Sequence, residues 1–414
     1  MKRTLFSALG MAMIFVAIHQ FAFGSEVSKV EVADDTTAID LNPKALTAQY
    51  GKKGFEFKTR DNKFSLQLRS RLQFRFLTPY PSNPRSVADM NDDPITTFRV
   101  NRSRLKVGGH GFQPWLKYYW EYDVGASRLL DFRIMVEKWK GFNIKVGQWK
   151  IDYTRERTIS SGKQQHVDRS IVNRPFTLDR QQGVCFYGQY EGAAGAANIQ
   201  YWVSILTGSG INSRRNDDDK LLYVGKLQWN ALGGGTDYSG SDTKISEKPR
   251  LSLAVAAATN TSDVTRFSSG GGGNLDGIPA GAPGQYDLNQ GVFEASFKYK
   301  GFSFEHEYHM KEVTDNLSDE KAELSGYYVQ AGYFLGQSLD FIPEPLELAL
   351  RYAYLEPNAD VPSWYNDEVT ATVNWFFKGH NNKLTADFSY FTIEDPDGES
   401  DSATRIRLQW DISF

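Results

Sequence analysis

Arg-Ile-Arg-Leu-Gln-Trp-Asp-Ile-Ser-Phe, at residues 405–414, is the stretch that decides the fold. Successive side chains of a strand point to opposite faces, so one face here is apolar and the other polar. The apolar face carries Ile406, Leu408, Trp410, Ile412 and Phe414. A lipid-facing apolar side, a water-facing polar side and an aromatic residue at the end are typical of a transmembrane β-barrel strand. A water-soluble sheet can also alternate, but it has no need for the final aromatic residue.

The first 24 residues have the pattern of a secretory signal peptide. Lys2 and Arg3 precede an apolar run over residues 5–23, and residues 22–24 fit a small-x-small cleavage site. The alternative is a membrane-anchoring helix, which is disfavoured because the run is short and contains two polar residues in its later half. We therefore expect residues 1–24 to be removed on export.

The composition fits an exported membrane protein. Removal of Lys2 and Arg3 takes the formal net charge from -3 to -5, so we expect no nucleic-acid partner. The single cysteine, Cys185, excludes an internal disulfide. We expect residues 25–53 to form a periplasmic N-terminal segment without strand pattern, and residues 54–414 to form one barrel. A large barrel need not divide into domains, because its interior is wet rather than a solid core.

Alternation predicts sixteen strands in this region. They are expected at 64–76, 96–107, 116–124, 129–138, 142–150, 183–190, 198–206, 221–229, 250–258, 291–299, 302–310, 326–335, 346–355, 367–377, 383–391 and 403–414. Connections after odd-numbered strands are mostly long and those after even-numbered strands mostly short, with 125–128 and 230–249 as exceptions. This indicates an all-β, transmembrane antiparallel β-barrel with an aqueous channel. A soluble sandwich or propeller would not explain the loop lengths.

Basic residues gather on the inward face of three strands that a closed barrel makes neighbours. They are Arg69, Arg71 and Arg75, then Arg102, Arg104 and Lys106, and finally Arg405 and Arg407. An arginine facing lipid at mid-depth costs roughly 2–4 kcal/mol, so we expect these side chains to line one wall of the lumen. Arg133 is also expected to face inward, among acidic residues. The other inward acidic residues are Glu121, Asp123, Asp131, Glu137, Glu294, Glu305 and Glu307, which we expect to face the basic wall across the pore.

This distribution of charge has two interpretations. The guanidinium fork matches phosphate, carboxylate or sulfate oxygens, and a row of forks passes an anion from site to site. The alternative is ordinary mixed interior charge that gives no selectivity.

The third outer loop, residues 151–182, holds a second basic group. Its members are Arg155, Arg157, Lys163, Arg169, Arg174 and Arg180, interleaved with Asp152, Glu156, Asp168 and Asp179. Structureless loops of this length are usually functional or disordered. We expect this loop to fold into the lumen and to narrow it.

Motifs within 146–184 carry a family resemblance. They read Val-Gly-Gln-Trp-Lys from Val146, Arg-Glu-Arg-Thr-Ile-Ser-Ser-Gly from Arg155 and Arg-Gln-Gln-Gly-Val from Arg180. Over residues 54–190 the chain resembles the phosphate/polyphosphate-selective porin family. The resemblance implies a trimeric, sixteen-stranded outer-membrane porin with the third loop as its constriction. The chain departs from the family where Asp152 precedes Tyr153 in place of Pro-Phe-Gly, so passage of sugars or general solutes is the alternative to phosphate.

Other residue patterns are given lesser roles. Glu305, Glu307 and His309 share one face, but three ligands on one strand splay apart, so we expect lumen polar groups and no metal. Ser160, Ser161, His166 and Asp168 lack a nucleophile elbow, which disfavours a barrel enzyme. Asp217–Asp219 and 395–398 do not match calcium-loop spacing.

These observations together predict a non-enzymatic outer-membrane porin without cofactor that passes small anions. A non-selective porin is the alternative, followed by a barrel enzyme or adhesin. The expected partners are phosphate-like anions, the bilayer with lipopolysaccharide, two further copies in a homotrimer, and the outer-membrane assembly machinery, through the strand that ends at Phe414.

Overall fold

The computed structural model describes residues 45–51, 54–192 and 198–414. The predicted signal peptide, residues 1–24, and most of the predicted N-terminal segment lie outside the described residues. No helix among the described residues is long and apolar enough to cross a membrane.

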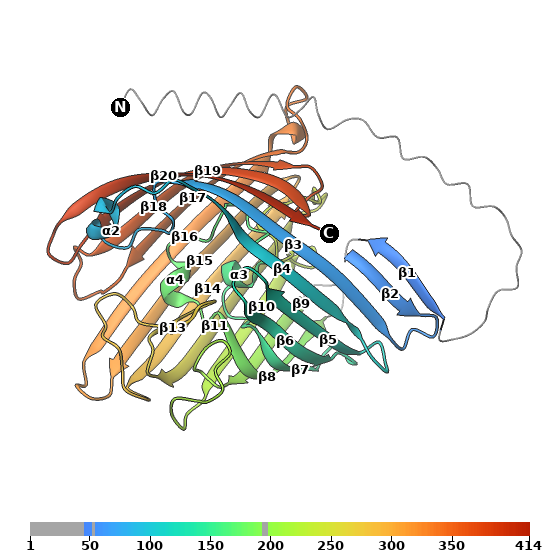
Figure 1. Ribbon diagram of the computed structural model, residues 1–414, viewed down its shortest axis with the longest axis horizontal. Helices are drawn as coiled ribbons and strands as arrows, with labels where there is room; N and C mark the ends of the chain where they lie inside the picture. Colours follow the sequence, from blue (N-terminus) through green and yellow to red (C-terminus); the bar gives the residue numbers. More distant parts are fainter. Residues whose placement is uncertain (1–44, 52–53, 193–197) are drawn as a thin grey trace, which may run out of the picture. The chain divides into compact units, whose positions relative to one another are not determined.

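Strands make up most of the described chain (Figure 1). The strands are β1 (Leu46–Gly51), β2 (Gly54–Thr59), β3 (Ser65–Thr78), β4 (Thr97–His110), β5 (Leu116–Asp123), β6 (Arg128–Val136), β7 (Asn143–Lys150), β8 (Arg180–Glu191), β9 (Asn198–Leu206), β10 (Leu222–Leu232), β11 (Arg250–Ser262), β12 (Arg266–Ser268), β13 (Gly271–Gly273), β14 (Tyr286–Tyr299), β15 (Phe302–Asp315), β16 (Lys321–Phe334), β17 (Leu346–Glu356), β18 (Tyr365–Phe376), β19 (Asn382–Glu394) and β20 (Ser400–Ser413). The short helices are α2 (Val87–Asn91), α3 (Arg155–Thr158), α4 (Asn173–Phe176) and η3 (Leu335–Gln337).

Sixteen of the described strands close into one antiparallel barrel, as the sequence predicts. Each strand from β3 to β20, apart from the small β12–β13 hairpin, pairs with the next, and β20 returns to pair with β3. The last pairing runs from Ile406 opposite Thr78 to Ser413 opposite Arg71. Every predicted strand overlaps one of these strands, since the alternation of side chains records the lipid and lumen faces directly.

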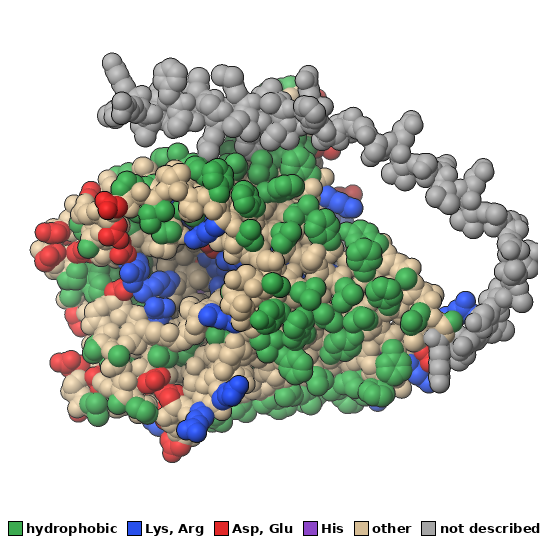
Figure 2. All heavy atoms as spheres, in the orientation of Figure 1, with side chains coloured by type: hydrophobic (Ala, Val, Ile, Leu, Met, Phe, Trp, Pro, Cys, Tyr) green, Lys and Arg blue, Asp and Glu red, His purple; other side chains and the backbone are tan. Residues whose placement is uncertain are grey.

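The two faces of the barrel wall differ in chemistry. On β3, Leu72 and Phe74 are 41% and 47% exposed on the outer face, whereas Arg71 and Gln73 are buried on the inner face. Figure 2 shows hydrophobic side chains gathered over the outside of the wall and Lys and Arg side chains in the hollow. We call the end of the barrel with the long connections the loop end, and the opposite end the turn end.

The segment before the barrel differs from the prediction. The sequence shows no strand pattern over residues 25–53, yet Leu46–Gly51 forms β1 and pairs with β2. All six β1 residues are exposed, so burial imposes no alternation on this strand. β2 pairs with the first residues of β3, beyond the point where β20 ends, so Gly54–Thr59 extends the wall and the closed barrel begins at Ser65.

A charge on the outer face tests this assignment of faces. Leu350 is 56% exposed in the middle of β17, so Leu350→Arg should destabilise the barrel in lipid vesicles by about 2–4 kcal/mol. The matched control is Leu346→Arg at the start of the same strand, which should cost about 0–1 kcal/mol near the interface. Urea titration of folding in vesicles measures both, and equal costs would contradict a lipid-facing Leu350.

Candidate functional site

The third loop, residues 151–179 between β7 and β8, lies inside the barrel and is hydrogen-bonded to the far wall. Figure 1 shows its helices α3 and α4 within the ring of strands. The bonds join Gln165 to Glu347 (2.8 Å), His166 to Thr372 (2.6 Å), the Val167 amide to Asp387 (3.3 Å) and the Ile171 amide to Glu368 (2.9 Å). These wall residues are on β17, β18 and β19, so the loop reaches across the lumen.

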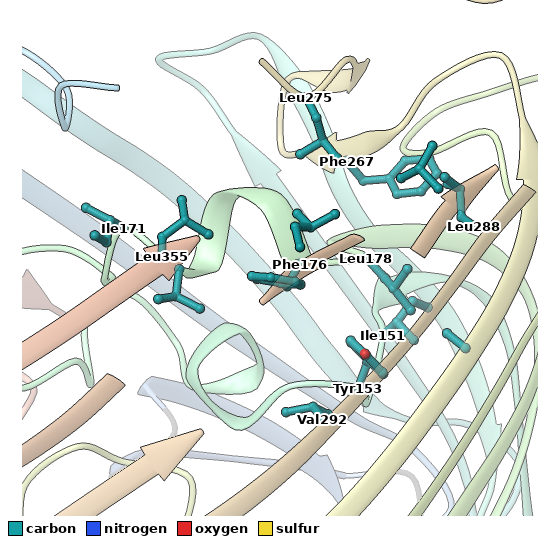
Figure 3. Close-up of a cluster of buried hydrophobic side chains, with 14 of the residues drawn as sticks. Ile151, Tyr153, Ile171, Phe176, Leu178, Phe267, Leu275, Leu288, Val292 and Leu355 are labelled. Atoms are coloured by element: carbon teal, nitrogen blue, oxygen red, sulfur yellow. The ribbon is translucent and has the colours of Figure 1, made fainter. Parts of the chain in front are cut away.

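Apolar packing holds the rear of this loop. Phe176 of α4 and Leu178 belong to one buried cluster with Leu288 and Val292 of β14 and with Phe267, in the connection between β11 and β14 (Figure 3). The Phe176 ring also stacks on His309 with centroids 4.9 Å apart. A solid hydrophobic cluster therefore occupies part of the lumen, which corrects the expectation of a wholly wet interior. The long connections supply Phe176, Leu178 and Phe267, which strand alternation does not reveal, whereas Leu288 and Val292 belong to the inner face of a strand.

Most of the basic residues of the third loop contact neighbouring groups. Arg155 pairs with Glu305 (3.1 Å), Arg174 with Asp276 (2.7 Å), Arg180 with Asp131 (2.7 Å) and Arg157 with Asp179. Arg169 donates to the carbonyl oxygens of Glu156 (2.9 Å) and Ile159 (2.8 Å). Lys163 instead has an exposed side chain. The loop's basic residues thus serve largely to fix its own path.

The predicted basic wall is assembled by β20, β3 and β4. Arg71 lies opposite Arg104 across one ladder and Ser413 across the other. Arg71 bonds Asp411 (2.9 Å) and Ser161 (3.1 Å), whereas Arg407 bonds Asp387 (2.6 Å). Arg405 donates to Asn83 (2.7 Å). These guanidiniums are therefore held in fixed orientations.

The predicted position of the acidic residues relative to this wall is wrong for β5. Glu121 and Asp123 do not face the basic wall from across the pore, because β5 pairs directly with β4. Arg104 contacts both carboxylates at 3.0 Å, and Lys106 lies 3.4 Å from Glu121. Arg133 on β6 likewise lies 3.8 Å from Asp131. Acidic side chains thus neutralise one edge of the basic wall at close range.

A cavity of about 440 Å³ opens at the loop end beside this wall. Its lining within the described chain includes eight arginines and two aspartates: Arg85, Arg102, Arg157, Arg169, Arg174, Arg266, Arg405 and Arg407, with Asp168 and Asp276. We call this space the outer cavity. Such an excess of guanidinium groups suits an anion with several oxygens.

A second cavity of about 190 Å³ lies on the turn side of the third loop. Its cationic lining residues are Arg69, Arg71, Lys106 and Lys163, the His380 ring also lines it, and no carboxylate of the described residues does. We call it the inner cavity. A larger groove of about 840 Å³ is lined mainly by small and apolar side chains such as Gly225 and Ala257, whose chemistry does not suit an ion.

Residues 160–168 separate the two cavities at the basic wall. Asp168 lines the outer cavity, lies 3.0 Å from Arg75 and 3.9 Å from Arg102, and has its pKa held well below the usual value. Burial opposes this lowering, but the nearby guanidiniums outweigh it. Ser160 and Gly162 line the inner cavity, where Arg71 leaves no room for a β-carbon at Gly162.

Several cavity residues were not predicted from the sequence. Arg85 and Arg266 come from the first and fifth outer loops, and His380 comes from a turn. Their contribution depends on how each connection folds back, which strand periodicity does not report. One signal for such residues is present in the sequence. The predicted turn at 230–249 is unusually long, and part of that segment also enters the lumen.

The other patterns noted in the sequence form no catalytic or metal-binding set. His166 bonds Thr372, whereas Ser160 and Ser161 accept hydrogen bonds from Arg71. His309 lies 3.0 Å from Glu307, while Glu305 pairs with Arg155. Within the described part of the chain, no group of three or more His, Cys, Asp or Glu residues is placed to hold a metal ion.

Known proteins match both the sequence and the fold. The family model "phosphate-selective porin O and P" matches residues 86–412. An uncharacterized protein of Aquifex aeolicus is 25% identical over 330 residues, which are 73% of this chain and 69% of that protein. The anion-selective porin from Comamonas acidovorans has a TM-score of 0.56 at 11% identity, covering 85% of this chain and all (100%) of the other.

Two further solved structures share the fold. The outer membrane channel DcaP of Acinetobacter baumannii has a TM-score of 0.56 at 13% identity, covering 86% of this chain and 99% of that one. In-vitro folded OmpT of Vibrio cholerae, in its trimer form, has a TM-score of 0.51 at 12% identity, covering 85% of this chain and 99% of that one.

The hydrogen bonds to the wall should determine how firmly the third loop is held. Glu368→Ala removes the acceptor of the Ile171 amide and the nearer carboxylate partner of Arg351, which keeps only Glu156 at 3.9 Å, a loss of about 3–5 kcal/mol for a buried pair. Amides of residues 155–172 should then exchange faster by hydrogen–deuterium mass spectrometry. Glu399→Ala, at an exposed position, is the control and should leave this exchange unchanged. Equal protection in both variants would show that the loop is held without Glu368, by the remaining wall bonds and the apolar packing.

Proposed function

Since the chain belongs to the phosphate-selective porin O and P family, we propose that this non-enzymatic outer-membrane porin passes small anions by diffusion, phosphate or polyphosphate among them. One observation carries the proposal: the lining of the outer cavity has eight arginines against two aspartates in the described chain. Guanidinium forks hold tetrahedral oxyanions through paired N–H donors. This cavity is therefore suited to collect such anions at the loop end, which faces the cell exterior in a porin.

The inner cavity continues the basic path toward the periplasm. Arg102 lines the outer cavity and Arg71 the inner one, and the ladder between β3 and β4 places Gln73 and Arg104 beside them. Conduction needs binding that is weak enough for release, which successive shared sites provide better than one tight site. An anion accordingly passes from the outer arginines to Arg69, Lys106 and Lys163.

A general porin without anion preference is the second candidate. The observation that favours it is the close pairing of the wall: Arg104 with Glu121 and Asp123, and Arg407 with Asp387. Where a carboxylate neutralises each guanidinium, the net field in the pore weakens. The two candidates differ in whether Arg102 and Arg69 dominate the potential along the path.

Charge reversal distinguishes these candidates. Arg102→Glu and Arg69→Glu each change the local charge by two units. We expect each substitution to make anion passage about 1 kcal/mol less favourable relative to cation passage, which lowers the anion-to-cation permeability ratio about fivefold. The ratio is obtained from reversal potentials across a planar bilayer in a salt gradient, with chloride and then phosphate. Arg60→Glu, at an exposed turn, is the control. Equal cation and anion permeability in the unaltered protein would refute the anion proposal.

We further propose that the porin is a homotrimer, as the Vibrio cholerae barrel is in its trimer form. Strands β5 and β7 have 8 residues each, compared with 14 in β3, β14, β15 and β16. A tilted strand needs about 9–11 residues to cross the hydrocarbon core. The low wall over β5–β7, with exposed Phe132 and Ile134, is therefore suited to pack against another copy rather than lipid.

Substitutions on the low wall test the trimer. Phe132→Gln with Ile134→Gln should convert the trimer into monomers, because they remove apolar contacts between copies. Light scattering of the detergent-solubilised protein, corrected for bound detergent, gives the mass. Leu350→Gln, on an 11-residue strand, is the control and should leave the trimer intact. A trimer that survives the double substitution would place the interface elsewhere.

The remaining partners follow from the outer-membrane location. We propose that lipopolysaccharide surrounds the loop end and that the outer-membrane assembly machinery recognises the strand that ends at Phe414. We also propose cleavage after residue 24, followed by a periplasmic segment and the barrel. N-terminal sequencing of the protein isolated from outer membranes tests the cleavage.

A further inference from the structure

The connection between β10 and β11, residues 233–249, lies at the turn end, but its middle part is buried inside the barrel while both of its ends are exposed. Ser239, Ser241 and Asp242 are each 2% exposed or less. Turns at this end of a barrel are normally short and meet water. A buried turn therefore needs partners for its polar groups.

The barrel wall provides those partners. Lys298 of β14 donates to the carbonyl oxygens of Ser239 (2.6 Å) and Ser241 (3.1 Å) and to the Asp237 carboxylate (2.7 Å). Asp242 accepts from the Gly301 amide at 3.0 Å. Lys298 is itself buried, and its bonds, together with the bond from the Gly301 amide, hold the turn against the inner surface of the barrel wall.

The turn also meets the third loop. The Gly240 amide donates to the Lys163 carbonyl oxygen at 2.8 Å, and a β-carbon at Gly240 would lie 2.7 Å from the Gln165 nitrogen. Gln165 and Ser241 both donate to the Glu347 carboxylate, at 2.8 and 2.9 Å. Two segments that enter the lumen from opposite ends are thus locked together near the turn end, beside the start of β17.

This contact lies beside the inner cavity. Lys163 and His380 line that cavity, and the turn touches both, since Ser239 lies 3.3 Å from His380. The third loop and the turn together occupy the side of the lumen formed by β14–β18. The space left for a permeating ion is therefore confined to the basic wall of β3 and β4.

We propose that residues 233–249 are a second constriction element, which holds the Lys163 segment of the third loop toward the basic wall and sets the size limit of the periplasmic exit. The turn acts as a positioning segment through Lys163 and carries no ion itself. This inference rests on the proposed function only for which ion passes through the pore. The narrowing of the pore itself does not depend on that proposal.

Shortening the turn tests the proposal. Replacement of residues 234–248 by Asn-Gly should raise single-channel conductance about twofold or more, because an ion then passes a wider exit. Liposomes that contain the variant should also admit neutral sugars that are too large to pass through the unaltered porin. Heat-dependent migration on gels confirms that the variant folds.

A point substitution covers the case in which the shortened barrel does not fold. Lys298→Met keeps the apolar stem but removes the donors to the turn, so conductance and the sugar size limit should rise. Lys117→Met is the control, since this lysine of β5 pairs with Glu137, away from the turn and from the third loop. Conductance and size limit equal to the unaltered porin in the folded variants would overturn the second constriction.

The reversal potential of the same channels separates the two proposals. If the anion proposal fails, the reversal potential shows no anion preference in any variant, yet the shortened turn still widens the pore. If the second constriction fails, the size limit does not change, whatever the ion preference.

Discussion

The antiparallel pairing of β20 with β3 is the constraint on which the rest of the structure depends. A sheet in hydrocarbon cannot leave an edge open, because each unpaired backbone group costs several kcal/mol there. Closure satisfies both edges and fixes the register, with Gln409 opposite Arg75 and Ser413 opposite Arg71. That register places the polar side chains of the first and last barrel strands on one inner wall, where Arg71 meets Asp411.

Closure creates a lumen that the chain then largely fills. The third loop enters from one end and residues 233–249 from the other, and both are fixed by buried carboxylates and lysines on β14–β19. Glu347 shows how this works, since it accepts hydrogen bonds from Gln165, Ser241 and Asn374 while it is fully buried. A buried carboxylate is tolerated only with such partners, so the inserted segments and the wall charges stabilise one another.

Charge pairing in this interior has two consequences for transport. It holds guanidiniums such as Arg104 and Arg407 in fixed positions, which suits recognition of a rigid oxyanion. It also cancels much of their field, so the net potential depends on less neutralised groups such as Arg102 and Lys163. The composition of the two cavities, rather than the total count of basic residues, is therefore the relevant description of the pore.

The sequence by itself determined the sixteen strands, their faces and the closure that makes Arg71, Arg104 and Arg407 members of one wall. These features follow from alternation, because lipid and water impose a period of two on every spanning strand. Only the tertiary structure decided that Glu121 and Asp123 pair with Arg104 beside them, that Arg85 and Arg266 reach the outer cavity, and that the middle of residues 233–249 lies inside. Such contacts arise from ladder register and from the folding of long connections, and neither has a periodicity that a sequence displays.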